Sequence, residues 1–166
     1  DDDGDNVMHY DADGKLQPDH GVGWGNIDYG LLRDGRLLGA PYAYRDERNL
    51  AAVEVVHGIV PPEELYRLNG LQHLSFNTLF QLTADRTAGM LELADSHLLL
   101  PDLLGYWLTG RSVAERTNAS TTGLLGVETG EWDFALAERL GLPQRLFRPL
   151  VNAGTEVGAL VPSAVR

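Results

Sequence analysis

Short apolar runs and longer periodic stretches alternate along this chain from residue 27 onward, as strands alternate with helices in many domains. The apolar runs predict strands over residues 27–32, 37–44, 98–100, 121–127 and 154–161. The periodic stretches predict helices over residues 47–57, 61–69, 78–93, 101–110 and 132–140. This alternation is typical of an α/β domain.

Turn and capping residues set the expected boundaries of these elements. Asp34-Gly35 suits the positive backbone angles of a tight hairpin after the first strand. Asp46 and Asn77 are placed to cap the first and third helices, because both side chains can accept a backbone N–H. Pro41 lacks a donor for a sheet, so we expect it at an edge or a bulge. Gly89 weakens the third helix near its end.

The first 23 residues differ from the rest of the chain. They are rich in Asp and Gly and lack periodicity, so we expect a weakly ordered acidic start followed by one domain over residues 24–166. Asp1, Asp3 and Asp5 suggest the beginning of a calcium loop. The segment lacks the Gly at the sixth position and the Glu at the twelfth that an EF-hand requires, so we predict no metal site there.

The composition narrows the classes of function. The chain has 166 residues, of which 43% are hydrophobic, enough for one domain with a core. Its net charge of −11 argues against nucleic-acid binding, which needs clustered Lys and Arg. It has no Cys, so disulfides and thiolate metal sites are excluded. No apolar run approaches the ~20 residues of a membrane span. We therefore expect no membrane partner and a cytoplasmic location.

Five motifs follow one another in an order that resembles a known family. They are Asp28–Leu32, Tyr42–Arg48, Gly70–Leu82, Pro101–Gly110 and Asn118–Trp132. Together they resemble the amino-terminal domain of the FGGY carbohydrate kinases, and most closely the rhamnulokinases, in register from about Asp28 to Leu160. The resemblance implies a ribonuclease-H-like fold, of the actin and hexokinase type, that is incomplete here. It also implies phosphorylation of a ketose, L-rhamnulose, with ATP and Mg²⁺ as cofactors.

Two catalytic segments of the family are not found in this sequence. The family's phosphate-gripping hairpin, an Asp-Leu-Gly-type turn, has no match before Asp28. The family's catalytic Asp lies in a His-Asp-Thr motif downstream of the position matching Leu160, and this chain contains no His-Asp pair. It also lacks a Gly-rich loop ending in Gly-Lys-Ser/Thr. We therefore assign no catalytic residue and expect the chain alone to be inactive. The alternative is a non-catalytic sugar-binding or inactive remnant.

Candidate sugar contacts lie first in Tyr44-Arg45-Asp46, which offers an aromatic ring, a guanidinium group and a carboxylate in consecutive positions. Strand alternation would put Arg45 on the opposite face, and a break at the strand end would let all three converge. In the alternative interpretation, Asp46 only caps the helix and Arg45 pairs with Glu47 or Asp34.

The resemblance adds two further regions. It places a sugar contact around Asn77, whose other interpretation is a plain helix cap. Rhamnulokinases carry Asp-Thr-Trp-Gly-Val-Asp before the first strand, and the glycine of that motif touches the sugar. Here Gly25 lies one residue too far from Asp28, so either Asn26 is inserted or Asn26 takes the glycine's place. The substrate-binding candidates are thus Gly25, Asn26, Asp28, Tyr44, Arg45, Asp46 and Asn77. Because the family's first strands are missing, we also expect an exposed sheet edge and self-association through it.

Overall fold

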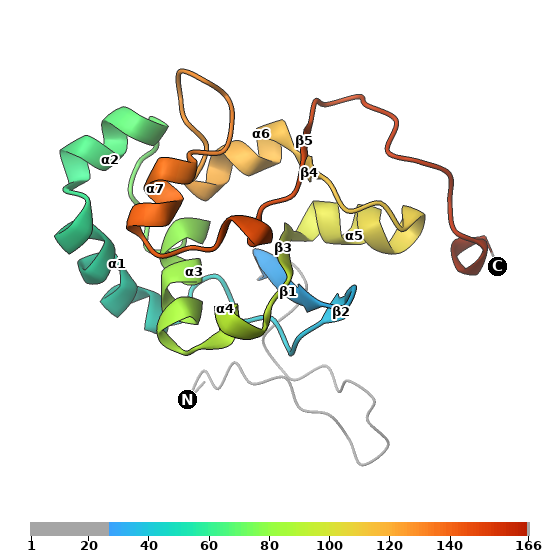
Figure 1. The fold of residues 1–166 in the computed structure, drawn as a ribbon, viewed down its shortest axis with the longest axis horizontal. Coiled ribbons are helices and arrows are strands. Elements are labelled where there is room, and N and C mark those ends of the chain that lie inside the picture. The colour runs from blue at the N-terminus through green and yellow to red at the C-terminus, as the bar shows by residue number, and fades with distance from the viewer. Residues whose placement is uncertain (1–26, 166) are drawn as a thin grey trace, which may run out of the picture.

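The computed structural model describes residues 27–165, and everything below concerns that range. Gly25 and Asn26, the acidic start and the expected boundary between residues 23 and 24 all lie outside it. Within the range the structure combines helices with a small central sheet, as predicted for an α/β domain (Figure 1). No helix in this part of the chain is long and apolar enough to span a bilayer.

The central sheet has three strands, β1 (Tyr29–Arg33), β2 (Arg36–Leu37) and β3 (Ser96–Leu99), in the order β2-β1-β3. Both pairings are antiparallel, with Tyr29 opposite Leu99 and Leu32 opposite Leu37. The β1–β2 turn confirms the predicted hairpin, since Asp34 and Gly35 have φ values of 50° and 74°. A second, parallel pair joins β4 (Ala114–Glu115) to β5 (Leu150–Val151).

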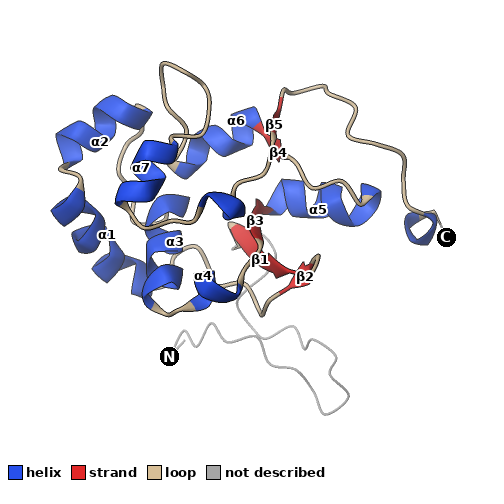
Figure 2. Ribbon diagram, in the orientation of Figure 1, coloured by secondary structure: helices blue, strands red, loops and turns tan. Residues whose placement is uncertain are grey.

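The helices surround these strands (Figure 2). They are α1 (Arg48–Ile59), α2 (Pro62–Asn69), α3 (Thr78–Thr87), α4 (Met90–Leu93), α5 (Leu100–Thr109), α6 (Arg116–Ala119) and α7 (Phe134–Arg139). Short 3-10 turns cover Ser120–Thr122, Gln144–Leu146 and Pro162–Ala164. The five predicted helices are therefore present. The third is divided in two at Gly89, whose left-handed φ of 74° interrupts the helical path.

Three strand predictions were wrong. The return strand expected over residues 37–44 ends at Leu37, and only an isolated bridge between Ala43 and Ile27 follows. Residues 121–127 begin in a 3-10 turn, where Thr122 donates its hydroxyl back to the Ala119 carbonyl instead of extending. Residues 154–161 form no strand either, and the actual strand, β5, precedes them. Gly154 at φ 82° is not in an extended conformation.

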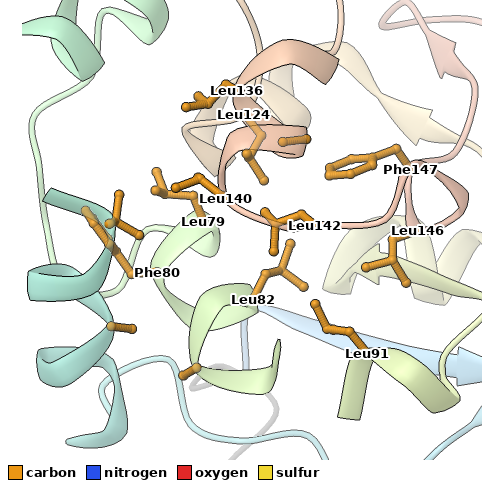
Figure 3. Packing of buried hydrophobic residues seen from close by; sticks show 14 of the residues in the cluster. Leu79, Phe80, Leu82, Leu91, Leu124, Leu136, Leu140, Leu142, Leu146 and Phe147 are labelled. Carbon is orange, nitrogen blue, oxygen red and sulfur yellow. The ribbon is translucent and has the colours of Figure 1, made fainter. Parts of the chain in front are cut away.

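The sheet is covered on both faces. Tyr29 and Leu31 of β1 belong to the large hydrophobic cluster shared with α1 and α3, and Leu32 joins Leu103 of α5 in a smaller cluster. Alternate β1 residues thus serve opposite layers, as strand geometry requires. Figure 3 shows the large cluster, in which Leu79 and Leu82 of α3 lie among side chains from α7 and the 142–147 segment.

Among the described residues, β3 has a strand partner only on its β1 side. The 3-10 turn of residues 144–146 packs against a face of the sheet at β3, where the His97 ring is bonded to the Leu146 carbonyl at 3.0 Å. The other side of β3, where an exposed edge is expected, has no strand partner among the described residues. Self-association through this edge stays a prediction, which sizing by light scattering can test: a monomer at all concentrations would contradict it.

His97 gives the fold a dependence on pH. Burial lowers the pKa of this imidazole from 6.5 to about 4, although its bond to Leu146 acts in the opposite direction. The folded state therefore binds fewer protons than the unfolded state between those pH values, so stability rises with pH through that window and is lost as the pH falls. The loss amounts to about 3 kcal/mol.

We predict that His97→Asn flattens this pH dependence. The Asn amide can still donate toward Leu146 at the position of Nδ1, but it does not titrate. Urea unfolding at intervals between pH 6.5 and 4 should show a smaller fall in the free energy of unfolding for the variant than for the unmodified chain. Equal slopes for both proteins would refute the role of His97.

Candidate functional site

Three segments that are distant in sequence meet at the start of β1. The bridge between Ile27 and Ala43 brings residue 28 beside the segment of residues 42–46. The Asp28 carboxylate accepts hydrogen bonds from Thr78 Oγ1 at 2.5 Å and from Gln81 Nε2 at 3.0 Å, both on α3. The structure thus brings together candidates from all three regions that the sequence analysis singled out and that lie within the described range.

Asp28 is a carboxylate held in a largely buried place. Burial raises its pKa, and the hydrogen bonds from Thr78 and Gln81 oppose that rise without cancelling it. Gln81 also donates to the Phe76 carbonyl at 2.8 Å, so one amide group ties the carboxylate to the segment before α3. A carboxylate fixed in this way is a preorganised acceptor for the hydroxyl groups of a polyol.

Tyr44, Arg45 and Phe76 form an aromatic and cationic cluster next to Asn77. The rings of Tyr44 and Phe76 meet edge to face, with centroids 5.3 Å apart. The Arg45 guanidinium lies 5.2 Å from the Tyr44 centroid and 5.8 Å from that of Phe76, and its Nε donates to the Tyr44 hydroxyl at 2.9 Å. No ion pair from Arg45 to Glu47 or Asp34 is found among the described residues, so that part of the alternative interpretation was wrong.

The chain does break after the short bridge at Ala43, as convergence of Tyr44 and Arg45 requires. The Asp46 N–H donates to the Ala43 carbonyl at 3.0 Å, which closes a turn over residues 43–46. Asp46 itself takes part in the helix start: its Oδ1 accepts the Arg48 N–H at 2.9 Å. The helix begins one residue later than expected, with Glu47 at the capping position and Asp46 supplying the acceptor.

Asn77 does not act as the predicted side-chain cap. It occupies the position before α3, but its Oδ1 accepts the N–H of Leu74 at 2.8 Å and not one from the helix. The Asn77 N–H in turn donates to the Leu74 carbonyl at 2.8 Å. The side chain therefore shapes the loop of residues 74–77, because closing a local turn competes with capping for the same oxygen. Among the described residues its amide nitrogen has no hydrogen-bond partner.

Thr78 and Gln81 are the site residues that the sequence analysis did not select. Both side chains donate hydrogen bonds to Asp28, and the spacing of polar residues in the sequence could have identified them. Thr78, Gln81 and Asp85 are polar residues spaced three and four apart on a helix that also carries Leu79, Phe80 and Leu82, so the three polar residues share one face. A polar stripe on a buried helix requires partners, and Asp28 is one of them.

The described residues offer no metal centre. No group of three or more His, Cys, Asp or Glu side chains in residues 27–165 is arranged to hold an ion. The arrangement presents carboxylate, guanidinium and amide groups beside two aromatic rings, which are the features that bind a sugar through its hydroxyl groups and its C–H faces.

Comparison with known proteins gives the family. Residues 32–166 match the FGGY family of carbohydrate kinases, N-terminal domain. The chain belongs to this family. Its curated relatives include the rhamnulokinase of Enterococcus faecalis, 45% identical over 142 residues, which cover 85% of this chain and 28% of that protein. The rhamnulokinase of Mannheimia succiniciproducens is 41% identical over 145 residues, covering 84% of this chain and 30% of the relative.

Solved structures confirm the expected fold. Gluconate kinase from Lactobacillus acidophilus superposes with a TM-score of 0.75 at 19% identity, covering 84% of this chain and 29% of the kinase. A carbohydrate kinase from Novosphingobium aromaticivorans gives a TM-score of 0.67 at 27% identity, covering 83% of this chain and 29% of its own. This FGGY chain thus has part of the actin- and hexokinase-like domain, and it spans less than a third of the length of these proteins.

Asp46 allows a test of its structural role at the start of α1. Because its carboxylate accepts the Arg48 N–H at the start of α1, we expect Asp46→Ala to lower the free energy of unfolding by ~1 kcal/mol. Asp46→Asn should keep most of that stability, since an amide oxygen also accepts the N–H. Urea unfolding of both variants measures this. An Asp46→Ala protein as stable as the unmodified chain would contradict the capping role.

Proposed function

We propose that this chain is the sugar-binding part of an ATP-dependent kinase that phosphorylates a ketose, L-rhamnulose. The observation that carries the proposal is its 38–45% identity to several proteins that are named rhamnulokinase. Matches at this level of identity cover 81–92% of the chain. The kinases found by structure comparison are named after different substrates. Similarity of fold alone therefore does not identify the sugar.

The role proposed for each site residue follows from the chemistry of its side chain. Asp28 accepts from a sugar hydroxyl, and the free amide of Asn77 and the guanidinium of Arg45 donate to others. The edge-to-face pair of Tyr44 and Phe76 presents apolar ring surface toward the C–H bonds of the ketose. Gly25 and Asn26 belong to the same proposed site by resemblance and lie outside the described residues. Asp46 contributes through the turn that it stabilises.

Phosphoryl transfer needs a base for the sugar hydroxyl and groups that hold the phosphates. We assign neither role to a described residue, and no cluster among these residues fits Mg²⁺. ATP and Mg²⁺ are therefore part of the proposal for the kinase as a whole, and no step is assigned to them here. A cytoplasmic location belongs to the same proposal, because cytoplasm supplies ATP.

Calorimetric titration of L-rhamnulose into the chain tests the proposal. We expect heat of binding with L-rhamnulose and weaker binding with D-xylulose or glycerol. Arg45→Ala should weaken the L-rhamnulose interaction by ~1.5–3 kcal/mol, the usual contribution of a hydrogen bond from a charged group. Arg33→Ala removes an exposed guanidinium elsewhere and should leave the affinity unchanged. Equal heats for all three compounds, or none for L-rhamnulose, would contradict the proposal.

The second candidate is a non-catalytic sugar-binding protein. It is favoured by the candidate site itself, whose carboxylate and paired aromatic rings suit sugar binding and to which we assign no catalytic residue. A coupled assay of the purified 166-residue chain with ATP, Mg²⁺ and L-rhamnulose should show no turnover, since a positioned base alone contributes ~10²–10⁴ in rate. Steady turnover, abolished by removal of the chain from the assay, would show that the chain contains catalytic groups that we have not assigned.

A further inference from the structure

A buried ionic network lies one helical turn beyond the candidate site. Asp85 of α3 is only 2% exposed, and its two carboxylate oxygens accept hydrogen bonds from the Arg48 guanidinium and the Tyr29 hydroxyl. A charge in such a place is costly unless it is paired, so each partner is held firmly. Burial and the neighbouring Asp85 raise the pKa of Tyr29 well above its usual value, which keeps the phenol a donor.

Arg48 connects this network to the sugar-contact segment. It is the first residue of α1, and its guanidinium lies 3.8 Å from the centroid of the Tyr42 ring. Its backbone N–H is bound by the Asp46 carboxylate. Arg48 therefore contacts the segment of residues 42–46 at both ends, at Tyr42 and at Asp46. Burial acts to lower the pKa of Arg48, but the charge of Asp85 and its hydrogen bond, together with Tyr29 and Asp46, outweigh burial and raise that pKa, so the guanidinium stays charged.

The side chains that hold Asp28 and the side chain that holds Arg48 lie on the same face of α3. Thr78 and Gln81 hold Asp28, and Asp85 follows Gln81 by one turn. A pocket beside this face is lined in part by Tyr42, Arg48, Gln81 and Asp85. Its charged side chains are used within the network, so the pocket does not define a separate site. What the network does is fix the position of one loop relative to α3.

We propose that Asp85 is a positioning residue for the ketose site: by holding Arg48, it sets the place of the segment that carries Tyr44 and Arg45 against Phe76. The expected effect of Asp85 on sugar affinity rests on the proposed function. Asp85 also has an expected effect on the backbone that does not depend on any sugar. Without Asp85, the backbone of residues 42–47 is less restrained, while the hydrophobic core around α3 is intact.

Two variants separate positioning from plain stabilisation. Asp85→Asn leaves Arg48 buried without its charge partner, so it should lower stability and loosen the segment. The double variant Asp85→Leu with Arg48→Met, made on a Tyr29→Phe background so that no buried hydroxyl loses its acceptor, replaces the buried pair by apolar side chains of similar size, which commonly preserves or raises stability. Glu64→Gln is the control, because Glu64 forms an exposed ion pair with Arg139 at 2.6 Å, away from Asp28 and the segment.

Amide hydrogen exchange measures the restraint on the segment of residues 42–47, and titration with L-rhamnulose measures the sugar affinity. We expect faster amide exchange over residues 42–47 in both Asp85 variants, with L-rhamnulose binding about 2- to 30-fold weaker. The double variant should melt near the unmodified chain and still bind weakly. If instead it regains both the affinity and the slow exchange, or if Asp85→Asn leaves exchange over 42–47 unchanged, the positioning role is wrong. If the unmodified chain does not bind L-rhamnulose, the proposed function fails, and the exchange result alone decides the role of Asp85.

Discussion

Helix α3 is the element on which the rest of this structure depends, because eight consecutive residues, 78–85, are buried. Its apolar residues, among them Leu79, Phe80 and Leu82, form the centre of the hydrophobic core. Its polar residues cannot reach water and must find partners within the protein. Thr78 and Gln81 find Asp28, and Asp85 finds Tyr29 and Arg48. The same burial that stabilises the fold therefore organises the candidate site.

This arrangement couples the site to the core more closely than a surface loop would allow. Asp28 directly precedes Tyr29, the first residue of β1, and both are bound by α3. The turn of residues 43–46 is fixed through Arg48 and through the Tyr44–Phe76 contact. Rigid support of this kind favours ligand binding, because the contacting groups lose little freedom when a sugar arrives.

The sequence predicted the helices better than the strands, for a physical reason. Helix signals such as Pro62 at the start of α2 and Gly70 at its end are local, and the structure uses both. Strand pairing depends on distant partners, so the runs at 121–127 and 154–161 could not be judged from their own residues. Residues 37–44 show the same limit: the hairpin turn was local and correct, whereas the length of the return strand was not.

The candidate site shows a similar division. The motifs identified Asp28, Tyr44, Arg45 and Asn77 as separate candidates, and the structure brings their segments together. The Asn77 side chain was expected to cap α3, but it closes the preceding turn, since two local geometries compete for one oxygen and sequence does not rank them. Asp85 was not found because its partners, Tyr29 and Arg48, are 56 and 37 residues away.

In the proposed site, one face of α3 positions Asp28, the turn of residues 43–46 and the loop of residues 74–77 around a ketose. Mapping backbone amide chemical shifts during titration with L-rhamnulose tests it most directly, because each segment reports separately. We expect the largest changes to fall together on residues 28, 44–46 and 76–78, with one common affinity. Changes confined elsewhere, for example to the pocket around Trp132 and Phe134, would contradict it.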